Sequence, residues 1–363
     1  MTLTNYILPV IITIAISIIW IFLFRKIWIM DKPGNDLKNT RKPVPTIQWI
    51  FVYISFIAIV RLIYPEFFHQ NIFRWLFRWS LPIVIVQTID ELRYIDKIKF
   101  NLPPLARLFS HVLWWILAVY IWHLGNQEIL INWVNYMIPQ RLFVIFFIWR
   151  SILCINAVNR FDGIYAQASG VSSVWFLTIF LLINFVVFKE YPYLTQENYV
   201  LLTWISKLAF VLFSISLVSA FVEYKPLALV RDVWIMFYGF SLAYLSVVWW
   251  AKIWTLIVAL SLVIFDALRV WFYRIFIMKK SPLKWDYTHL HHRLMWLGWN
   301  RKEVRAFVWI WSVIMMVLIL IQWTDRMNKV VIFAMMAIVF FGLNIYLFLI
   351  KKLPCGLNLQ KNN

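Results

Sequence analysis

The sequence predicts an all-α fold, a polytopic integral membrane protein with about eleven transmembrane helices. Hydrophobic residues make up 63% of the 363-residue chain and charged residues only 14%, whereas a soluble domain is about half apolar and a quarter charged. The apolar residues gather in long runs of about the 18–20 residues that a helix needs to cross the hydrocarbon core. Because lipid cannot hydrogen-bond to the backbone, these runs are predicted to be helices.

Seven runs contain no charged residue, and four weaker runs fill the gaps between them. The charge-free runs span residues 5–24, 43–60, 108–127, 163–188, 233–251, 306–324 and 330–350. The weaker runs span residues 71–89, 140–155, 201–222 and 253–273. We expect them to form one membrane domain over residues 1–350, followed by a short basic cytoplasmic tail over residues 351–363.

The first run is expected to be a transmembrane helix rather than a cleavable signal. It is long, Arg25 and Lys26 follow it, and no small-residue cleavage site comes after them. Cys154 and Cys355 are the only cysteines. Both fall on the predicted cytoplasmic side, where thiols stay reduced, so neither a disulfide nor a cysteine-based metal site is expected.

The net charge of +19 sets the expected orientation in the membrane. In an eleven-helix topology, the segments after the odd-numbered helices carry 26 of the 35 lysine and arginine residues. The positive-inside rule makes that side cytoplasmic and predicts a multi-pass protein of the plasma (inner) membrane. The basic loops would attract anionic lipid head groups of the bilayer. No nucleic-acid partner is expected, because the charge is spread over short loops without a recognisable binding module.

Carboxylates are few in this chain, so their positions are informative. Five lie at or near the cytoplasmic ends of predicted helices: Asp90, Glu91, Asp162, Asp232 and Asp266. Ionisable groups at this depth cost several kcal/mol unless they pair or face a polar cavity, so the group indicates a functional site. Each one alone could also be a helix cap, and Asp266 could pair with Arg269 one turn further on. Carboxylates suit Mg²⁺, and the nearby basic residues suit a polyphosphate substrate.

The predicted site depends on a single membrane crossing between residues 127 and 156. Residues 129–138 could instead lie along the membrane surface or cross separately, and a second crossing would place Asp90 and Asp162 on opposite faces. Several tryptophans are interpreted as interfacial or lipid-facing residues rather than stacking platforms. These are Trp114, Trp115, Trp249, Trp250 and Trp271.

Five segments carry polar and charged residues between or at the ends of the apolar runs. They are MDKPGNDLKNTRKPVPT (30–46), IDELRYIDKIKF (89–100), NAVNRFDGIYAQASGVS (156–172), RDVWIMFYGFSLA (231–243) and FDALRVWFYRIFIMKKSPLKWDYTHLHHRLMWLG (265–298). In this order they resemble motifs of the polyprenyl-phosphate N-acetylhexosamine-1-phosphate transferases, a family that includes the phospho-MurNAc-pentapeptide translocases. The last segment, with its F-D-x-L-R-V, S-P and H-L-H-H-R-L elements, favours the branch that transfers GlcNAc-1-phosphate to undecaprenyl phosphate.

The resemblance implies a Mg²⁺-dependent transfer of HexNAc-1-phosphate from a UDP-sugar to undecaprenyl phosphate at the cytoplasmic face, with release of UMP. Mn²⁺ is an alternative ion, and a homodimer is left open. The implied catalytic residues are Asp90, Glu91, Asp162 and Asp232, of which Asp232, Asp90 and Glu91 would bind the metal. The implied substrate-binding residues are Arg41, Lys42, Asn156, Asn159, Arg269, His289, His291, His292 and Arg293.

The histidine cluster has other interpretations. Zinc binding is disfavoured because no cysteine is nearby and the spacing of His289, His291 and His292 does not place all three on one helical face. The histidines could also cap a helix at the membrane surface. The resemblance makes them donors to the diphosphate, with Arg293 and Arg269 adding fixed charge.

This chain departs from the family pattern at several positions. Glu91 stands for an aspartate of the pair, Tyr165 for the second aspartate of D-G-x-D-G, and Ala166 for the glycine that follows. Arg231 stands for the first glycine of G-D-x-G-S, and Trp234 for its second glycine. These changes leave open a catalytically silent relative that binds lipid carrier or scaffolds envelope assembly. A transporter is disfavoured, because the chain shows no internal repeat and no matching pair of broken helices.

Overall fold

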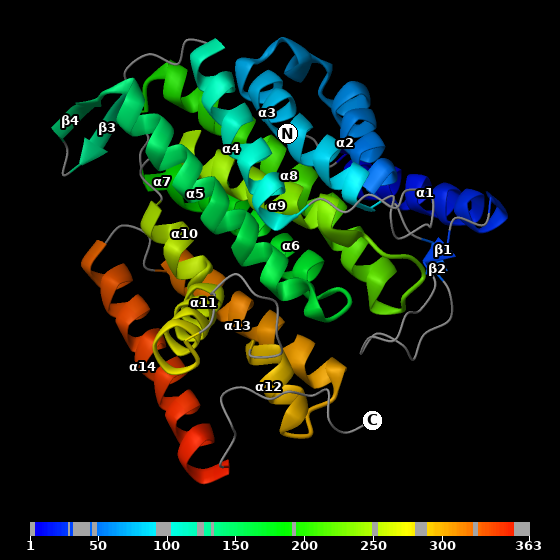
Figure 1. Ribbon diagram of the computed structural model, residues 1–363. Coiled ribbons are helices and arrows are strands. Elements are labelled where there is room, and N and C mark those ends of the chain that lie inside the picture. The colour runs from blue at the N-terminus through cyan, green and yellow to red at the C-terminus, as the bar shows by residue number, and fades with distance from the viewer. Residues whose placement is uncertain are drawn as a thin grey trace. The chain divides into compact units, whose positions relative to one another are not determined.

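The computed structural model describes residues 4–27, 30–31, 44–45, 49–91, 103–121, 127–131, 134–190, 194–248, 253–279, 289–321 and 326–351 (Figure 1). Its contacts divide the chain into two compact units, Met1–Ala251 and Lys252–Asn363, each of which is described by itself. The single domain expected over residues 1–350 stays a prediction.

The first unit is built mainly from helices. The α-helices are α1 (Thr4–Ile27), α2 (Trp49–Ile63), α3 (Asn71–Glu91), α4 (Pro104–Ile121), α5 (Gln140–Arg160), α6 (Gln167–Leu181), α7 (Phe188–Glu190), α8 (Gln196–Tyr224) and α9 (Arg231–Val248). Short helical turns are η1 (Pro65–His69), η3 (Phe161–Gly163) and η4 (Leu182–Val187), which continues α6 into α7. The strands are β1 (Met30–Asp31), β2 (Val44–Pro45), β3 (Gln127–Ile131) and β4 (Val134–Ile138).

The second unit is also helical in its described part. Its elements are α10 (Ile253–Ala259), α11 (Ser261–Phe272), the π-helical turn η6 (Tyr273–Ile277), α12 (Leu290–Trp296), α13 (Arg301–Ile321) and α14 (Arg326–Lys351). Both α10 and α11 pack against α14, and α12 packs against α13.

Six helical segments are long and apolar enough to cross a membrane, as expected for a multi-pass membrane protein. They are Tyr6–Ile27, Asn71–Asp90, Val144–Gly163, Gln167–Glu190, Gln196–Tyr224 and Arg301–Ile321. Each of the eleven runs predicted from the sequence overlaps at least one helix. The total of eleven crossings and the orientation stay predictions.

The segment between α4 and α5 differs from the all-helical expectation. Strands β3 and β4 pair antiparallel, from Gln127 opposite Ile138 to Ile131 opposite Val134. A five-residue strand rises only about 17 Å, whereas a transmembrane strand needs about 9–11 residues. These strands are therefore too short to form the separate crossing that the sequence left open. Their isoleucine and valine residues favour a strand over a helix.

Helix α9 lies at the centre of the first unit, where it packs against α3 and α5. At Gly239, an added Cβ would come within 2.6 Å of the Cα of Ile155, so the backbones of α9 and α5 touch. Trp115 of α4 is 1% exposed and stacks on Phe240 at 5.8 Å. Its predicted place in a lipid-facing belt is therefore wrong, since aromatic packing against α9 buries it. Trp271 is exposed as expected.

Candidate functional site

Two predicted site residues, Asp90 and Asp232, lie at the same end of a helix pair. Near the other end, the Tyr244 hydroxyl of α9 donates to the carbonyl of Ile72 at the start of α3, over 2.8 Å. Towards the end of α3, Gln87 Nε2 lies 2.8 Å from the sulfur of Met236. The two helices therefore run antiparallel, and the end of α3 with Asp90 lies beside the start of α9 with Asp232.

Asp162 comes to the same end from α5. Phe147 of α5 and Tyr244 of α9 both pack on Trp79, whereas Ile155, two turns further along α5, faces Gly239. Helix α5 therefore also runs antiparallel to α9. Its end leads into η3, which carries Asp162 and packs against α9. The structure thus brings three of the four predicted catalytic carboxylates to one end of the first unit.

The environments of the predicted residues differ. Asp90 is 1% exposed, while Asp162, Asp232 and Asn159 are half-buried. Asn156 is exposed and donates to the carbonyl of Ile152 in its own helix, at 2.8 Å. This bond ties Asn156 to α5 and gives no support to its predicted contact with the nucleotide.

Two residues at this end of the first unit, Ala166 and Arg231, have a left-handed backbone. Among the described residues other than glycine, three have a positive φ: Ala166 at 63°, Arg231 at 61° and Lys279 at 50°. Ala166 precedes α6, and Arg231 begins α9 directly before Asp232. Ala166 and Arg231 are also two of the positions where the transferase motifs have glycine. Glycine adopts a left-handed conformation freely, whereas a residue with a Cβ pays about 1–2 kcal/mol.

Glu223 is a site residue that the sequence analysis missed. It is 3% exposed at the end of α8. Its carboxylate accepts from the Ser169 hydroxyl of α6 at 2.7 Å and from the backbone N–H of Val230 at 3.0 Å. Val230 directly precedes Arg231, so Glu223 links the start of α6 to the start of α9. Its signal in the sequence is a lone acid at the end of a long apolar run.

Arg150 is a second buried charged residue in the first unit. It lies within α5 and is 2% exposed. In the part of the chain that the structure describes, none of its three guanidinium nitrogens has a hydrogen-bond partner. Its guanidinium lies 5.9 Å from the ring centre of Phe146. A buried cation of this kind is costly in free energy.

The metal prediction was tested against the side chains of the described residues. Among them, no group of three or more histidine, cysteine, aspartate or glutamate side chains is placed to hold a metal ion. The side chain of Glu91 lies outside the described residues. Mg²⁺ commonly takes only one or two carboxylates and completes its shell with waters and substrate phosphates. Asp90 and Asp232 supply oxygen ligands of the kind that Mg²⁺ prefers.

In the second unit, Asp266 organises the histidine motif. Its carboxylate lies 2.7 Å from Arg269 Nη2 and 2.9 Å from His289 Nδ1, and it accepts from the backbone N–H of Leu290 at 3.0 Å. The alternative in which Asp266 pairs with Arg269 is therefore confirmed.

The three histidine rings lie close together. His289 precedes α12 in an extended conformation, and its ring is parallel to that of His291, 6.0 Å away. The rings of His291 and His292 are 4.1 Å apart. Because the backbone is extended at His289, the three histidine rings lie closer together than they would on a continuous helix. Arg293 is buried and donates to Asn344 Oδ1 of α14, which fixes α12 in the second unit.

The remaining predicted residues are not part of the group formed by Asp90, Asp162 and Asp232. Arg41 and Lys42 lie outside the described residues, as does Cys355. The histidine motif and the three carboxylates belong to different units. No protein-family model matches the chain, and no curated protein matches its sequence.

Proposed function

We propose that the protein transfers HexNAc-1-phosphate, with GlcNAc-1-phosphate as the preferred group, from a UDP-sugar to undecaprenyl phosphate. The observation that carries the proposal is the left-handed backbone at Ala166 and Arg231. Glycine is the residue most favoured where the backbone must be left-handed. Finding that backbone at two motif positions, without the glycines, supports the motif alignment independently of the side chains.

The proposed reaction is a phosphoryl transfer. A phosphate oxygen of the lipid attacks the β-phosphorus of the UDP-sugar and forms a new P–O–P linkage. The bond between the β-phosphorus and the bridging oxygen of the UDP breaks, and UMP leaves with that electron pair. The lipid phosphate is already ionised near neutral pH, so positioning and charge neutralisation are the main tasks of the protein.

The carboxylates at the end of the first unit would carry the metal and orient the acceptor. Asp232 and Asp90 would hold Mg²⁺ or Mn²⁺, which when bound stabilises charge on the diphosphate oxygens. Asp162, which η3 brings to the same end, would line the nucleotide side. Glu223 would act as a positioning residue, because it accepts from the N–H directly before Arg231 and Asp232.

The histidine motif, taken by itself within the second unit, has donors suited to a phosphate group. Because Asp266 engages Nδ1 of His289, the ring is oriented and its Nε2 takes no part in that bond. An imidazole held in this way presents one directional nitrogen to a ligand. Arg269, paired with Asp266, would then act through this orientation rather than as a direct clamp on phosphate.

A catalytically silent relative that binds the lipid carrier is the second candidate. Trp234, at a motif glycine, is fully buried and stacks on Phe237 at 4.4 Å. The indole therefore fills space that the glycine would leave open. This observation favours a protein whose site has been repacked around a different role.

The test is UMP release by the purified full-length protein in detergent, with undecaprenyl phosphate, Mg²⁺ or Mn²⁺, and a panel of UDP-sugars. Asp232→Asn is the test variant. Glu66→Gln is the matched control, since Glu66 pairs with Lys207 at 3.5 Å outside the site. Lipid- and metal-dependent release with one UDP-HexNAc, lost in Asp232→Asn and kept in Glu66→Gln, would support the transferase. No release with any donor, from protein shown to be folded, would overturn it in favour of the silent relative.

A further inference from the structure

A repeated Phe-Arg pair opens α3, in the sequence FRWLFR over residues 73–78. Phe73 and Phe77 are four residues apart and therefore share one face of the helix. Arg74 and Arg78 follow them by one residue each, so the basic stripe lies roughly 100° further round the same helix. Both arginines are exposed.

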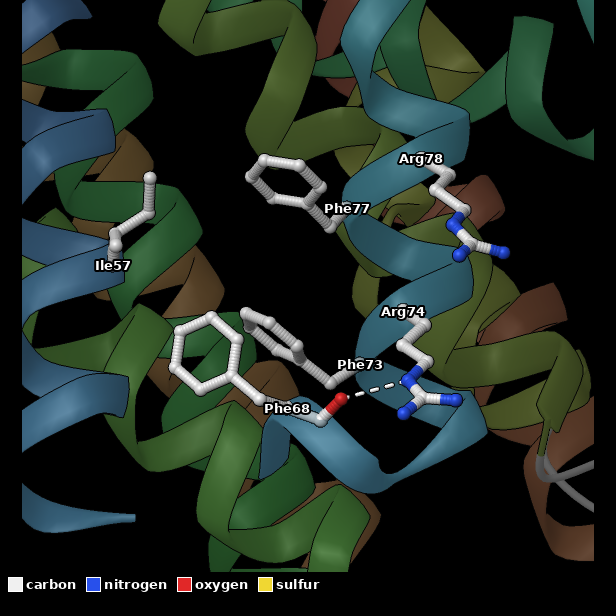
Figure 2. Close-up of a pocket in the computed structure, with 6 residues that line it drawn as sticks. All are labelled: Ile57, Phe68, Phe73, Arg74, Phe77 and Arg78. Carbon is white, nitrogen blue, oxygen red and sulfur yellow. Dashed lines mark hydrogen bonds between the residues drawn. The ribbon is translucent and has the colours of Figure 1, made fainter. Parts of the chain in front are cut away.

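The phenylalanine stripe lines an apolar cavity of about 150 Å³ (Figure 2). Ile57 of α2 and Phe68 of η1 close it from the side opposite α3. In Figure 2 the four apolar side chains surround the open space, and the side chains of Arg74 and Arg78, which also line the cavity, extend from successive turns of α3. The cavity therefore has an apolar lining suited to a hydrocarbon chain, with two cations beside it on α3.

The charges beside the cavity are mostly positive. Arg61 lies 5.9 Å from the ring centre of Phe68, which adds a third arginine to this end of the helix pair. Arg74 Nε donates to the Phe68 carbonyl at 2.7 Å, which orients the guanidinium without using its two terminal nitrogens. The nearby Glu66 is engaged by Lys207 at 3.5 Å. Two like charges four residues apart repel each other, so a bound anion would stabilise them.

The position in the span fits a lipid head group. Residues 71–90 form one of the six helices that could cross a membrane, and the two arginines lie within its first eight residues. Eight residues rise about 12 Å along the helix, so both side chains can reach the head-group region by snorkelling. Asp90 lies at the other end of the same helix, so this surface is separate from the proposed catalytic site.

We propose that this surface binds an anionic phospholipid of the bilayer, with its phosphate between Arg74 and Arg78 and one acyl chain in the cavity lined by Phe73 and Phe77. A phosphate accepts bidentate hydrogen bonds from guanidinium groups, which makes arginine well suited to the head group. The proposal does not depend on the transferase activity.

The test is binding of phosphatidylglycerol to the full-length protein in detergent, measured by native mass spectrometry. Phosphatidylcholine with the same acyl chains controls for charge, and glycerol phosphate controls for the acyl chain. The test variant is Arg74→Gln/Arg78→Gln. The matched control is Arg141→Gln/Lys225→Gln, which removes two exposed charges elsewhere in the same unit. Ile57→Trp, which fills the cavity without changing charge, is the second test variant.

We expect wild type to prefer phosphatidylglycerol, and Arg74→Gln/Arg78→Gln to weaken this binding by about tenfold or more, as expected for loss of charge-assisted hydrogen bonds. The control variant should bind as wild type, Ile57→Trp should bind more weakly, and glycerol phosphate should not compete. Equal binding by the arginine variant and wild type would overturn the proposal. So would undiminished binding by Ile57→Trp, or full competition by glycerol phosphate, since either result would show that the cavity holds no acyl chain.

Discussion

The two units use their carboxylates in different ways. In the second unit, Asp266 has Arg269, His289 and the N–H of Leu290 around it, so its charge is compensated within the protein. In the first unit, Asp90, Asp162 and Asp232 come from three separate elements to one end, beside a backbone held left-handed at Ala166 and Arg231. The comparison distinguishes a carboxylate that joins elements of its own unit from three carboxylates for which a role in phosphoryl transfer is proposed.

The largest expected effect is on the stability of the second unit. Asp266→Asn would remove the buried charge that Arg269 and His289 engage, and breaking a buried ion pair typically costs about 3–5 kcal/mol. Asp232→Asn should cost less than about 1 kcal/mol, because a half-buried acid in the first turn of a helix contributes mainly through the helix dipole. Thermal unfolding, with hydrogen exchange of the amides in α11 and α12, measures both. Equal losses in the two variants would show that the two carboxylates play the same role.

A smaller effect is expected at Glu223. Glu223→Gln keeps the size of the side chain but weakens the acceptance of hydrogen bonds from Ser169 and from the Val230 N–H. Loss of a buried charged acceptor costs about 1–3 kcal/mol. If Glu223 positions the start of α9, the rate of UMP release should fall by more than the loss of folded protein explains. Glu197→Gln at the exposed start of α8 is the control, and unchanged release in Glu223→Gln would rule out a positioning role.

The smallest expected effect is a gain in the stability of the fold. Ala166→Gly and Arg231→Gly each remove a Cβ from a left-handed backbone and should stabilise the protein by up to about 1 kcal/mol. Glycine substitution at an ordinary helical position, such as Ala168, should instead destabilise by about 1 kcal/mol. Chemical denaturation measures the difference, and destabilisation at both left-handed positions would remove the observation on which the motif alignment depends.

The helical framework was predictable from the sequence, because charge-free runs of membrane-crossing length leave the backbone few alternatives. The pairing of Asp266 with Arg269 was predictable as an alternative from their spacing. The burial of Trp115, the burial of Arg150 and the bonds of Glu223 were not, since each depends on which helices are neighbours. The strands β3 and β4 were missed because a short, mostly apolar stretch such as residues 129–138 is compatible with several local structures.

The most direct test of the proposed function is to follow the two phosphorus atoms of the donor. The protein is incubated with undecaprenyl phosphate, a divalent metal and UDP-GlcNAc labelled at either the α- or the β-phosphorus, and the lipid is then extracted. The account predicts that β-label enters the lipid fraction while α-label leaves with UMP, and that Asp232→Asn abolishes both. Absence of β-label from the lipid, with this and every other UDP-HexNAc and from protein shown to be folded, would contradict the account.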